Sequence, residues 1–251
     1  MAGQLAHIWR HPIKSHGQEA IDRASLSLGQ GLPMDRVWAV IHENSPVDPA
    51  APVWAKSRSF VIGTDVNPLV AMSAQMHDDG TITLRHPHLA DITLNLDAPA
   101  DQARLLAWTA PLMTEGRPKA TNVVKLQTHG VFDTDFPSIS LNNLASLDAL
   151  SAVAEHAMDM RRFRGNLWFS GLEAWQEHGW LGRDVRLGSA VLNIVEPVVR
   201  CAATTVNPDS AVVDVETPYL LRKHWGHRDF GVYARVVQPG DIALGDTLEL
   251  I

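Results

Sequence analysis

The strongest constraint on the fold of this chain is its succession of short strand-like runs, which only a few helical segments interrupt. Apolar alternation and β-branched residues predict strands over residues 4–10, 19–28, 37–41, 69–76, 81–84, 92–96, 166–169, 185–187, 190–199, 231–237 and 247–251. Helices are predicted over residues 101–108, from about 141 to 154, and over 217–225. Strands and helices do not alternate regularly, which disfavours a doubly wound parallel sheet. We therefore predict a mainly β architecture with barrel-like sheets.

Prolines mark the expected division of the chain. Pro99, Pro111 and Pro118 interrupt the pattern between residues 97 and 130, and 251 residues suffice for two small domains. We predict an amino-terminal β domain over residues 1–110 and a second domain over 111–251. A further cluster of three prolines predicts an extended surface loop over residues 43–54.

Composition excludes several classes of protein. Lys plus Arg is 21 against 28 for Asp plus Glu, and a net charge of −7 disfavours general nucleic-acid binding, although a local anion pocket remains compatible. The single cysteine excludes a disulfide scaffold, a Cys-ligated iron–sulfur cluster and a thiolate zinc site. Neither a signal peptide nor an apolar run of ~20 residues is present, so we expect a cytoplasmic protein without a membrane segment.

Common catalytic motifs are missing. The chain has no GxxxxGK[ST] phosphate loop, no GxSxG nucleophile elbow, no HExxH and no GxGxxG. Twelve histidines include the close pairs His86/His88 and His224/His227. Neither pair belongs to a recognisable set of three or four zinc ligands, so we assign them to surface or packing roles.

The most informative segment is EPVVRCAATTVNPDS, residues 196–210, where a predicted strand ends at Cys201. Functional groups often lie where a strand gives way to a loop. Arg200 would favour the thiolate form of Cys201, but adjacent strand residues point to opposite faces, so the two side chains need not meet. The alternative is an inert, buried cysteine that packs as a small hydrophobe.

Three further segments carry cations beside predicted strands. They are RRFRGN at residues 161–166, HPIKS at 11–15 and MDR at 34–36. The guanidinium groups of RRFRGN match phosphate geometry, and Lys14 and Ser15 of HPIKS could bind a phosphate. Taken singly, both segments are more readily explained as polar turns.

Together and in chain order, the segments RHPIKS, MDRVWAV, RRFRGN, VVRCAATTVNPDS and FGVYARVVQPGDIALGDTL resemble MOSC proteins. The resemblance covers nearly the whole chain. It is closest to the branch that contains the mitochondrial amidoxime-reducing component and its bacterial relatives. It implies a MOSC β-barrel domain preceded by a MOSC N-terminal β domain, and a pterin-based molybdenum cofactor.

The resemblance also implies roles for individual residues. Cys201 would be the thiolate ligand of molybdenum at the catalytic centre, which suits a soft sulfur donor. Residues expected to bind the pterin and its phosphate are Lys14, Ser15, Arg36, Arg164, Asn166 and Arg200, with Tyr233 near the cofactor. Thr204, Thr205 and Asp209 are expected to support the segment after Cys201.

The function implied is a molybdenum-dependent oxidoreductase that reduces small N-hydroxylated compounds such as amidoximes, hydroxylamines and N-hydroxylated bases. With one cysteine, the chain would take electrons from a separate donor protein of ferredoxin, flavodoxin or cytochrome type. Pyridoxal phosphate binding is a further family-level description that the resemblance carries. The chain departs from the family at Phe136, where a serine often precedes the proline, and in residues 43–56.

Two alternatives remain open on the sequence. The first is a carrier that binds sulfur or the molybdenum cofactor without turnover, because the same cysteine and cations would serve it. The second is a thiol hydrolase in which a histidine activates Cys201.

Overall fold

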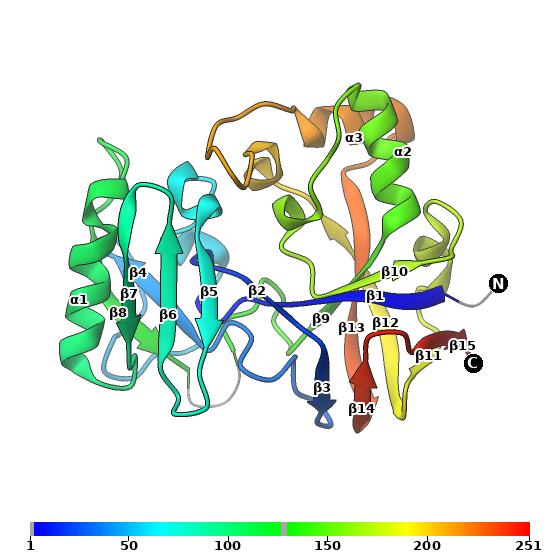
Figure 1. Ribbon diagram of the computed structural model, residues 1–251, viewed down its shortest axis with the longest axis horizontal. Coiled ribbons are helices and arrows are strands. Elements are labelled where there is room, and N and C mark those ends of the chain that lie inside the picture. The colour runs from blue at the N-terminus through cyan, green and yellow to red at the C-terminus, as the bar shows by residue number, and fades with distance from the viewer. Residues whose placement is uncertain (1–2, 127–129) are drawn as a thin grey trace.

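Strands outnumber α-helices fifteen to three in the described residues, which confirms the predicted mainly β class (Figure 1). The computed structural model describes residues 3–126 and 130–251. Its strands are β1 (Gly3–Arg10), β2 (Glu19–Ile21), β3 (Arg23–Leu26), β4 (Trp38–His42), β5 (Ser73–Met76), β6 (Ile82–His86), β7 (Leu89–Leu94), β8 (Ala120–Lys125), β9 (Ile139–Asn143), β10 (Leu167–Ser170), β11 (Asp184–Leu187), β12 (Ala190–Val199), β13 (Asp229–Gln238), β14 (Gly240–Ala243) and β15 (Thr247–Leu250). The α-helices are α1 (Pro99–Thr109), α2 (Leu144–Ala154) and α3 (Thr217–Trp225).

Seven strands close into a barrel in the order β10-β9-β13-β12-β11-β15-β1, with β1 pairing back to β10. The β9–β10 pair is parallel and its neighbours are antiparallel. Inward-pointing side chains such as Leu5, Leu141 and Leu192 fill the interior, as expected for a barrel of this strand number. The barrel is therefore a packed core, and a ligand site has to lie outside it.

A second lobe packs beside the barrel, on the left in Figure 1. It contains the antiparallel pair β4–β8, the sheet β5-β6-β7 and helix α1. Leu69, Leu84 and Leu105 are fully buried in its core. The predicted hairpin is present, because Met76 pairs with Ile82 and a turn at Gly80 joins the two strands.

The two lobes interleave along the chain. Strand β1, at the amino terminus, completes the barrel, and β3 pairs with β14 near the carboxyl terminus. Residues 11–18 lead from the barrel to β2, and residues 30–37 lead on to β4. These connecting segments carry the cationic motifs HPIKS and MDR, and they run along the junction of the lobes.

The helices follow the predicted pattern with one shift. Helix α3 has the predicted bounds and ends at Gly226, whose φ is 80°. Helix α2 starts at Leu144 and not near residue 141, because Leu141 belongs to β9. Asn143 caps α2 by accepting a hydrogen bond from the Ala145 amide.

The other differences are local. The predicted strand at 19–28 is divided into β2 and β3, and the first half of 69–76 is a 3₁₀ turn. Strands β8, β9 and β14 were not predicted from the sequence. No helix in the described ranges is both long enough and apolar enough to cross a bilayer.

Candidate functional site

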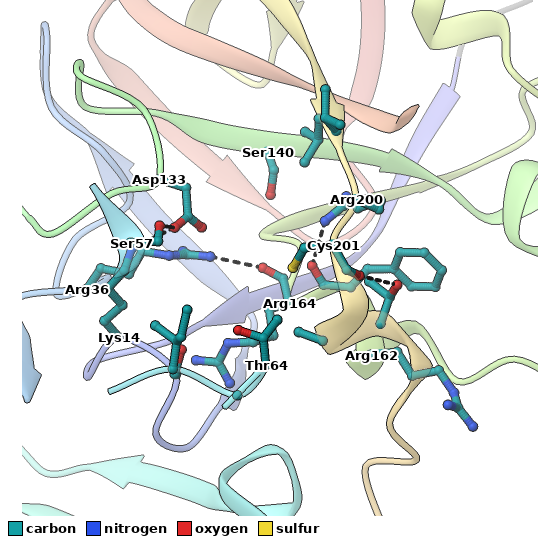
Figure 2. Close-up of a pocket in the computed structure, with 18 of the residues that line it drawn as sticks. Lys14, Arg36, Ser57, Thr64, Asp133, Ser140, Arg162, Arg164, Arg200 and Cys201 are labelled. Carbon is teal, nitrogen blue, oxygen red and sulfur yellow. Dashed lines mark hydrogen bonds and ion pairs between the residues drawn. The ribbon is translucent and has the colours of Figure 1, made fainter. Parts of the chain in front are cut away.

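A cavity of about 300 Å³ lies where the two lobes meet, and Figure 2 shows the side chains around it. It brings together side chains that are far apart in the sequence. The predicted site residues that line it are Lys14, Ser15, Arg36, Arg164, Arg200, Cys201, Thr204 and Tyr233. Lys14 and Arg36 come from the connecting segments of the amino-terminal half, whereas Cys201 follows the barrel strand β12.

Cys201 is exposed at this cavity and is not buried in the core. It precedes the short 3₁₀ helix η6 (Ala202–Thr205). The Thr204 hydroxyl donates to the Cys201 carbonyl at 2.9 Å, and the Thr217 hydroxyl donates to the Thr204 carbonyl at 3.0 Å. The backbone of Cys201 is therefore held in place while its thiol stays accessible.

Arg200 is buried beside Cys201 and anchors the end of β12. Its guanidinium donates to the carbonyls of Phe163 at 2.8 Å and Phe230 at 2.6 Å, and to Oδ1 of Asn142 at 2.9 Å. Burial lowers the pKa of Arg200 to about 10. With most of its donors engaged by the protein, Arg200 mainly positions the Cys201 segment.

Lys14 forms an ion pair at the opposite wall of the cavity. Its Nζ donates to Asp133 Oδ1 at 2.6 Å and to the Val131 carbonyl at 3.0 Å. The Ser57 hydroxyl donates to the same carboxylate oxygen at 2.6 Å. Burial acts to raise the pKa of Asp133, but the charges of Lys14 and Arg36 outweigh it and hold that pKa below its usual range. Asp133 is therefore an ionised carboxylate at the cavity wall.

Arg36 is held by a buried network behind the cavity. Its guanidinium pairs with Asp35, which also accepts from the backbone amide of His11 at 2.6 Å. Burial, helped by Arg164, lowers the pKa of His11 to about 3, so His11 is neutral. Nη2 of Arg36 donates to the Arg164 carbonyl at 3.1 Å, which links two of the cationic motifs directly.

The three arginines of RRFRG have different partners. Arg161 pairs with Asp159 and Asp209, and Arg162 pairs with Asp214 at 2.6 Å and points away from the cavity in Figure 2.

Arg164 differs from the other two arginines, because it forms no ion pair with any described residue. Its Nη2 donates to the Gly17 carbonyl at 3.1 Å, and its buried Nη1 has no partner. Burial and then the charge of Arg36 lower the pKa of Arg164 to about 9.

Three residues that line the cavity have a strained backbone conformation. Ser15, Arg36 and Arg164 have φ values of 62°, 52° and 47°, in the left-handed region that side chains other than glycine seldom adopt. Such conformations cost roughly 1–3 kcal/mol each and cluster at functional sites. The presence of three such residues around one cavity supports its assignment as a candidate functional site.

Three predicted residues do not line this cavity. Asn166 is buried, where its Oδ1 accepts from the Ser140 amide and its Nδ2 donates to the Trp9 carbonyl. Thr205 donates to the Ala202 carbonyl at 2.7 Å. Asp209 is exposed, pairs with Arg161 and lines a different cavity. All three shape the segments that carry the site.

Several lining residues were not predicted from the sequence, notably Ser57, Thr64, Asp133 and Ser140. Asp133 lies three positions before Phe136, where the sequence departs from the family pattern. That departure was the feature of the sequence that could have drawn attention to Asp133. Phe136 does not line the cavity and packs its ring under the Arg235 guanidinium at 4.9 Å. In the described part of the chain, no three His, Cys, Asp or Glu side chains gather as a metal site.

The donor set matches an anionic group that carries a soft metal. An unpartnered guanidinium N–H beside a second arginine suits a phosphate, and an exposed thiol suits a thiophilic metal. The fold and the cavity thus define a two-lobed β-barrel protein with one accessible thiol facing a cluster of cations.

The chain belongs to the MOSC proteins that carry a MOSC N-terminal domain. The model of the MOSC N-terminal beta barrel domain matches residues 2–129, and the MOSC domain matches residues 129–249. These matches confirm the resemblance that the sequence motifs indicated.

Relatives cover most of the chain at low identity. Mitochondrial amidoxime-reducing component 1 of Mus musculus is 25% identical, over 99% of this chain and 82% of the relative. The corresponding Homo sapiens protein is 24% identical, over 99% and 83%. Among solved structures, the YUAD protein from Bacillus subtilis has a TM-score of 0.48 and 13% identity, and the match covers 100% of this chain and 96% of that one.

Proposed function

We propose that this protein is a molybdenum-cofactor-dependent reductase of small N-hydroxylated compounds, with Cys201 as the thiolate ligand of the metal. The observation that carries the proposal is the single accessible thiol in the same cavity as Arg164, whose buried Nη1 has no hydrogen-bond partner among the described residues. The names of the relatives, amidoxime-reducing components, support the substrate class.

Different residues of the chain would bind the phosphate and the metal of the cofactor. Arg164, with Ser15 and Arg36 beside it, would hold the phosphate of the cofactor, because its Nη1 is the buried donor that lacks a partner. Cys201 would hold the metal, and the hydrogen bond from Thr204 to its carbonyl holds its backbone in place. When bound, the cofactor supplies a two-electron redox couple that takes up oxygen from the substrate.

The remaining wall shapes the approach of the substrate. Ser57, Thr64 and Asp133 lie across the cavity from Cys201 and present hydroxyl and carboxylate oxygens (Figure 2). The ionised state of Asp133 makes it a hydrogen-bond acceptor, suited to the N–H groups of an amidoxime. Electrons would come from a separate donor protein.

The decisive experiment measures metal and turnover together. Protein from a molybdenum-replete host should contain molybdenum and reduce benzamidoxime with a chemical electron donor. Cys201→Ala should lose both. In cofactor-free form it should unfold at the same temperature as the cofactor-free unchanged protein, because the thiol is exposed. Ser210→Ala, an exposed change on the same loop, is the matched control and should keep both.

Two outcomes would contradict the proposal. Bound cofactor with no reduction of any N-hydroxylated substrate would instead identify a carrier. A metal-free protein that hydrolyses thioesters through Cys201 would identify a thiol hydrolase.

A further inference from the structure

Helix α3 and the turn after it carry exposed positive charge on an acidic protein. Residues 217–228 contain Arg222, Lys223 and Arg228 and neither Asp nor Glu, although the whole chain has a net charge of −7. All three cations are exposed. None of them forms an ion pair with a described residue, whereas exposed cations elsewhere, such as Arg85, pair with an aspartate. Their charges are therefore available to a partner.

An exposed aromatic ring accompanies these cations. Tyr219 is 61% exposed and lies one helical turn before Lys223, whose Nζ is 5.9 Å from the centre of the ring. Tyrosine and arginine are the residue types enriched where proteins bind one another. We call Tyr219, Arg222, Lys223 and Arg228 the basic surface.

The helix dipole explains only part of this surface. Cations in the last turn of a helix interact favourably with its carboxyl end, which accounts for Arg222 and Lys223. The effect is confined to that turn, and Arg228 lies beyond Gly226, where the helix ends. Tyr219 carries no charge, so the dipole does not explain its exposure. A role in recognition accounts for all four residues together.

The basic surface is joined to both sides of the thiol segment. At the start of α3, the Thr217 hydroxyl donates to the Thr204 carbonyl at 3.0 Å, in the short helix η6 that follows Cys201. Beyond the end of α3, the Arg228 carbonyl accepts from the Arg200 amide at 2.9 Å. A protein bound to the basic surface would therefore lie next to the segment that carries Cys201.

Packed aromatic rings fill the space between α3 and Arg200. The ring of Trp225 in α3 lies 4.5 Å from that of Trp175, which lies 5.7 Å from Phe230. Phe230 stacks on Phe163 at 4.2 Å, and the Arg200 guanidinium lies 5.3 Å from the Phe163 ring. Electron transfer slows steeply with distance and is faster through packed protein than across a gap. This side of the molecule is thus suited to the entry of electrons.

The charge of the surface selects the kind of partner. Electron-transfer complexes between proteins are small and transient, and complementary charge speeds their association. Three unpaired cations beside the thiol segment would attract an acidic face on an electron-donor protein. An anionic membrane or a nucleic acid is a less suitable partner, because either would also repel the acidic remainder of the chain.

We propose that the basic surface is the docking site for a small acidic electron-donor protein that reduces the metal held at Cys201. This inference rests on the proposed function. For each N-hydroxylated substrate, the donor is oxidised by two electrons and two protons come from solvent. The N–O bond of the substrate breaks, and an N–H bond and water form.

Charge reversal in Arg222→Glu/Lys223→Glu tests the docking site, with flavodoxin as the acidic probe. Binding of oxidised flavodoxin to the full chain is measured by calorimetry and by NMR shifts. At low salt it should weaken at least about ten-fold, because the attracting charges now repel. The difference should vanish near 1 M salt, where the screening length is only about 3 Å.

A kinetic measurement on the molybdenum-loaded protein follows the electrons themselves. With benzamidoxime present, oxidation of reduced flavodoxin should slow by a similar factor in the charge-reversed variant. Turnover with a reduced viologen, a small chemical donor that needs no docking site, should be unchanged.

The matched control is Arg23→Glu/Arg183→Glu, which changes the net charge by the same amount. Both residues are exposed and form no ion pair with a described residue. They lie on β3 and just before β11, strands that lie away from α3 in Figure 1. This variant should bind flavodoxin as the unchanged protein does, and thermal unfolding verifies that both variants fold.

Four results would overturn the docking site. They are no saturable binding of flavodoxin at low salt, equal binding by the unchanged and charge-reversed proteins, and an equal loss in the control variant. The fourth is binding to phosphatidylserine vesicles that charge reversal abolishes while flavodoxin binding persists, which would identify a membrane-binding surface. Absence of turnover with the reduced viologen would contradict the proposed function instead, because the binding measurement does not depend on turnover.

Discussion

At the scale of single residues, tertiary partners decide which of several similar side chains is available to a ligand. Arg161, Arg162 and Arg164 are alike in the sequence, yet the first two are neutralised by aspartates. Arg164 keeps a buried N–H without a partner. A buried cation of this kind lowers the stability of the empty protein and favours the binding of an anion.

Replacing Arg164 tests whether its buried charge favours cofactor binding and lowers the stability of the cofactor-free protein. Arg164→Met should lower molybdenum content strongly, because the phosphate loses its buried donor. The cofactor-free protein should become more stable by about 1 kcal/mol, because an unpaired buried charge is removed. Metal analysis and chemical denaturation measure the two effects.

Arg186→Met, on the distant strand β11, is the control and should change neither quantity. A cofactor content in Arg164→Met equal to that of the unchanged protein would exclude Arg164 as the phosphate anchor.

At the scale of elements, the packing of β9 against β13 holds the site in place. Asn142 of β9 accepts from Arg200, and Gly231 of β13 lies against it. A Cβ at Gly231 would lie 2.6 Å from Asn142 Oδ1 and 2.7 Å from the Leu141 carbonyl, and its φ is 74°. The close approach of these strands therefore requires glycine.

Gly231→Ala should destabilise the protein by about 2–4 kcal/mol, combining left-handed strain with overpacking. Gly80→Ala is the matched control, since Gly80 has φ 82° and no atom within 4 Å of its added Cβ. Gly80→Ala should lower the free energy of unfolding by about 1–2 kcal/mol, the cost of a left-handed backbone conformation for alanine. Equal losses in urea denaturation for both variants would show that the contact with Asn142 is unimportant.

At the scale of the whole molecule, buried neutral histidines at the junction make stability depend on pH. Burial lowers the pKa of His11 to about 3 and that of His16 to about 4. As the pH falls, these histidines are protonated near pH 6.5 in the unfolded chain but only at lower pH in the folded protein. Their contribution to the free energy of unfolding is therefore fully present above pH 6.5 and is lost as the pH drops toward 4.

The loss attributable to His16 between pH 7 and pH 4 should be roughly 3 kcal/mol, at about 1.4 kcal/mol per pKa unit. His16→Asn should flatten this part of the profile of unfolding free energy against pH, whereas His224→Asn, at an exposed position, should not. A His16→Asn profile parallel to that of the unchanged protein would contradict the assignment.

Sequence alone determined the class of the fold and most of its strands and helices, because alternation and turn residues are local signals. It also identified the segments around Lys14, Arg36, Arg164 and Cys201, because their order along the chain is distinctive. Strand β9 was not predicted, since its SLNN segment reads as the start of helix α2.

Tertiary structure decided the rest. The pairing of β1 with β10 and the ion pair of Lys14 with Asp133 join residues more than a hundred positions apart. The contacts of Arg164 also depend on distant partners, which local sequence patterns do not reveal. Which charge is neutralised and which remains available depends on distances in the folded chain. The sequence could therefore name the cations, but only the folded chain separates the anchoring arginines from the unpaired one.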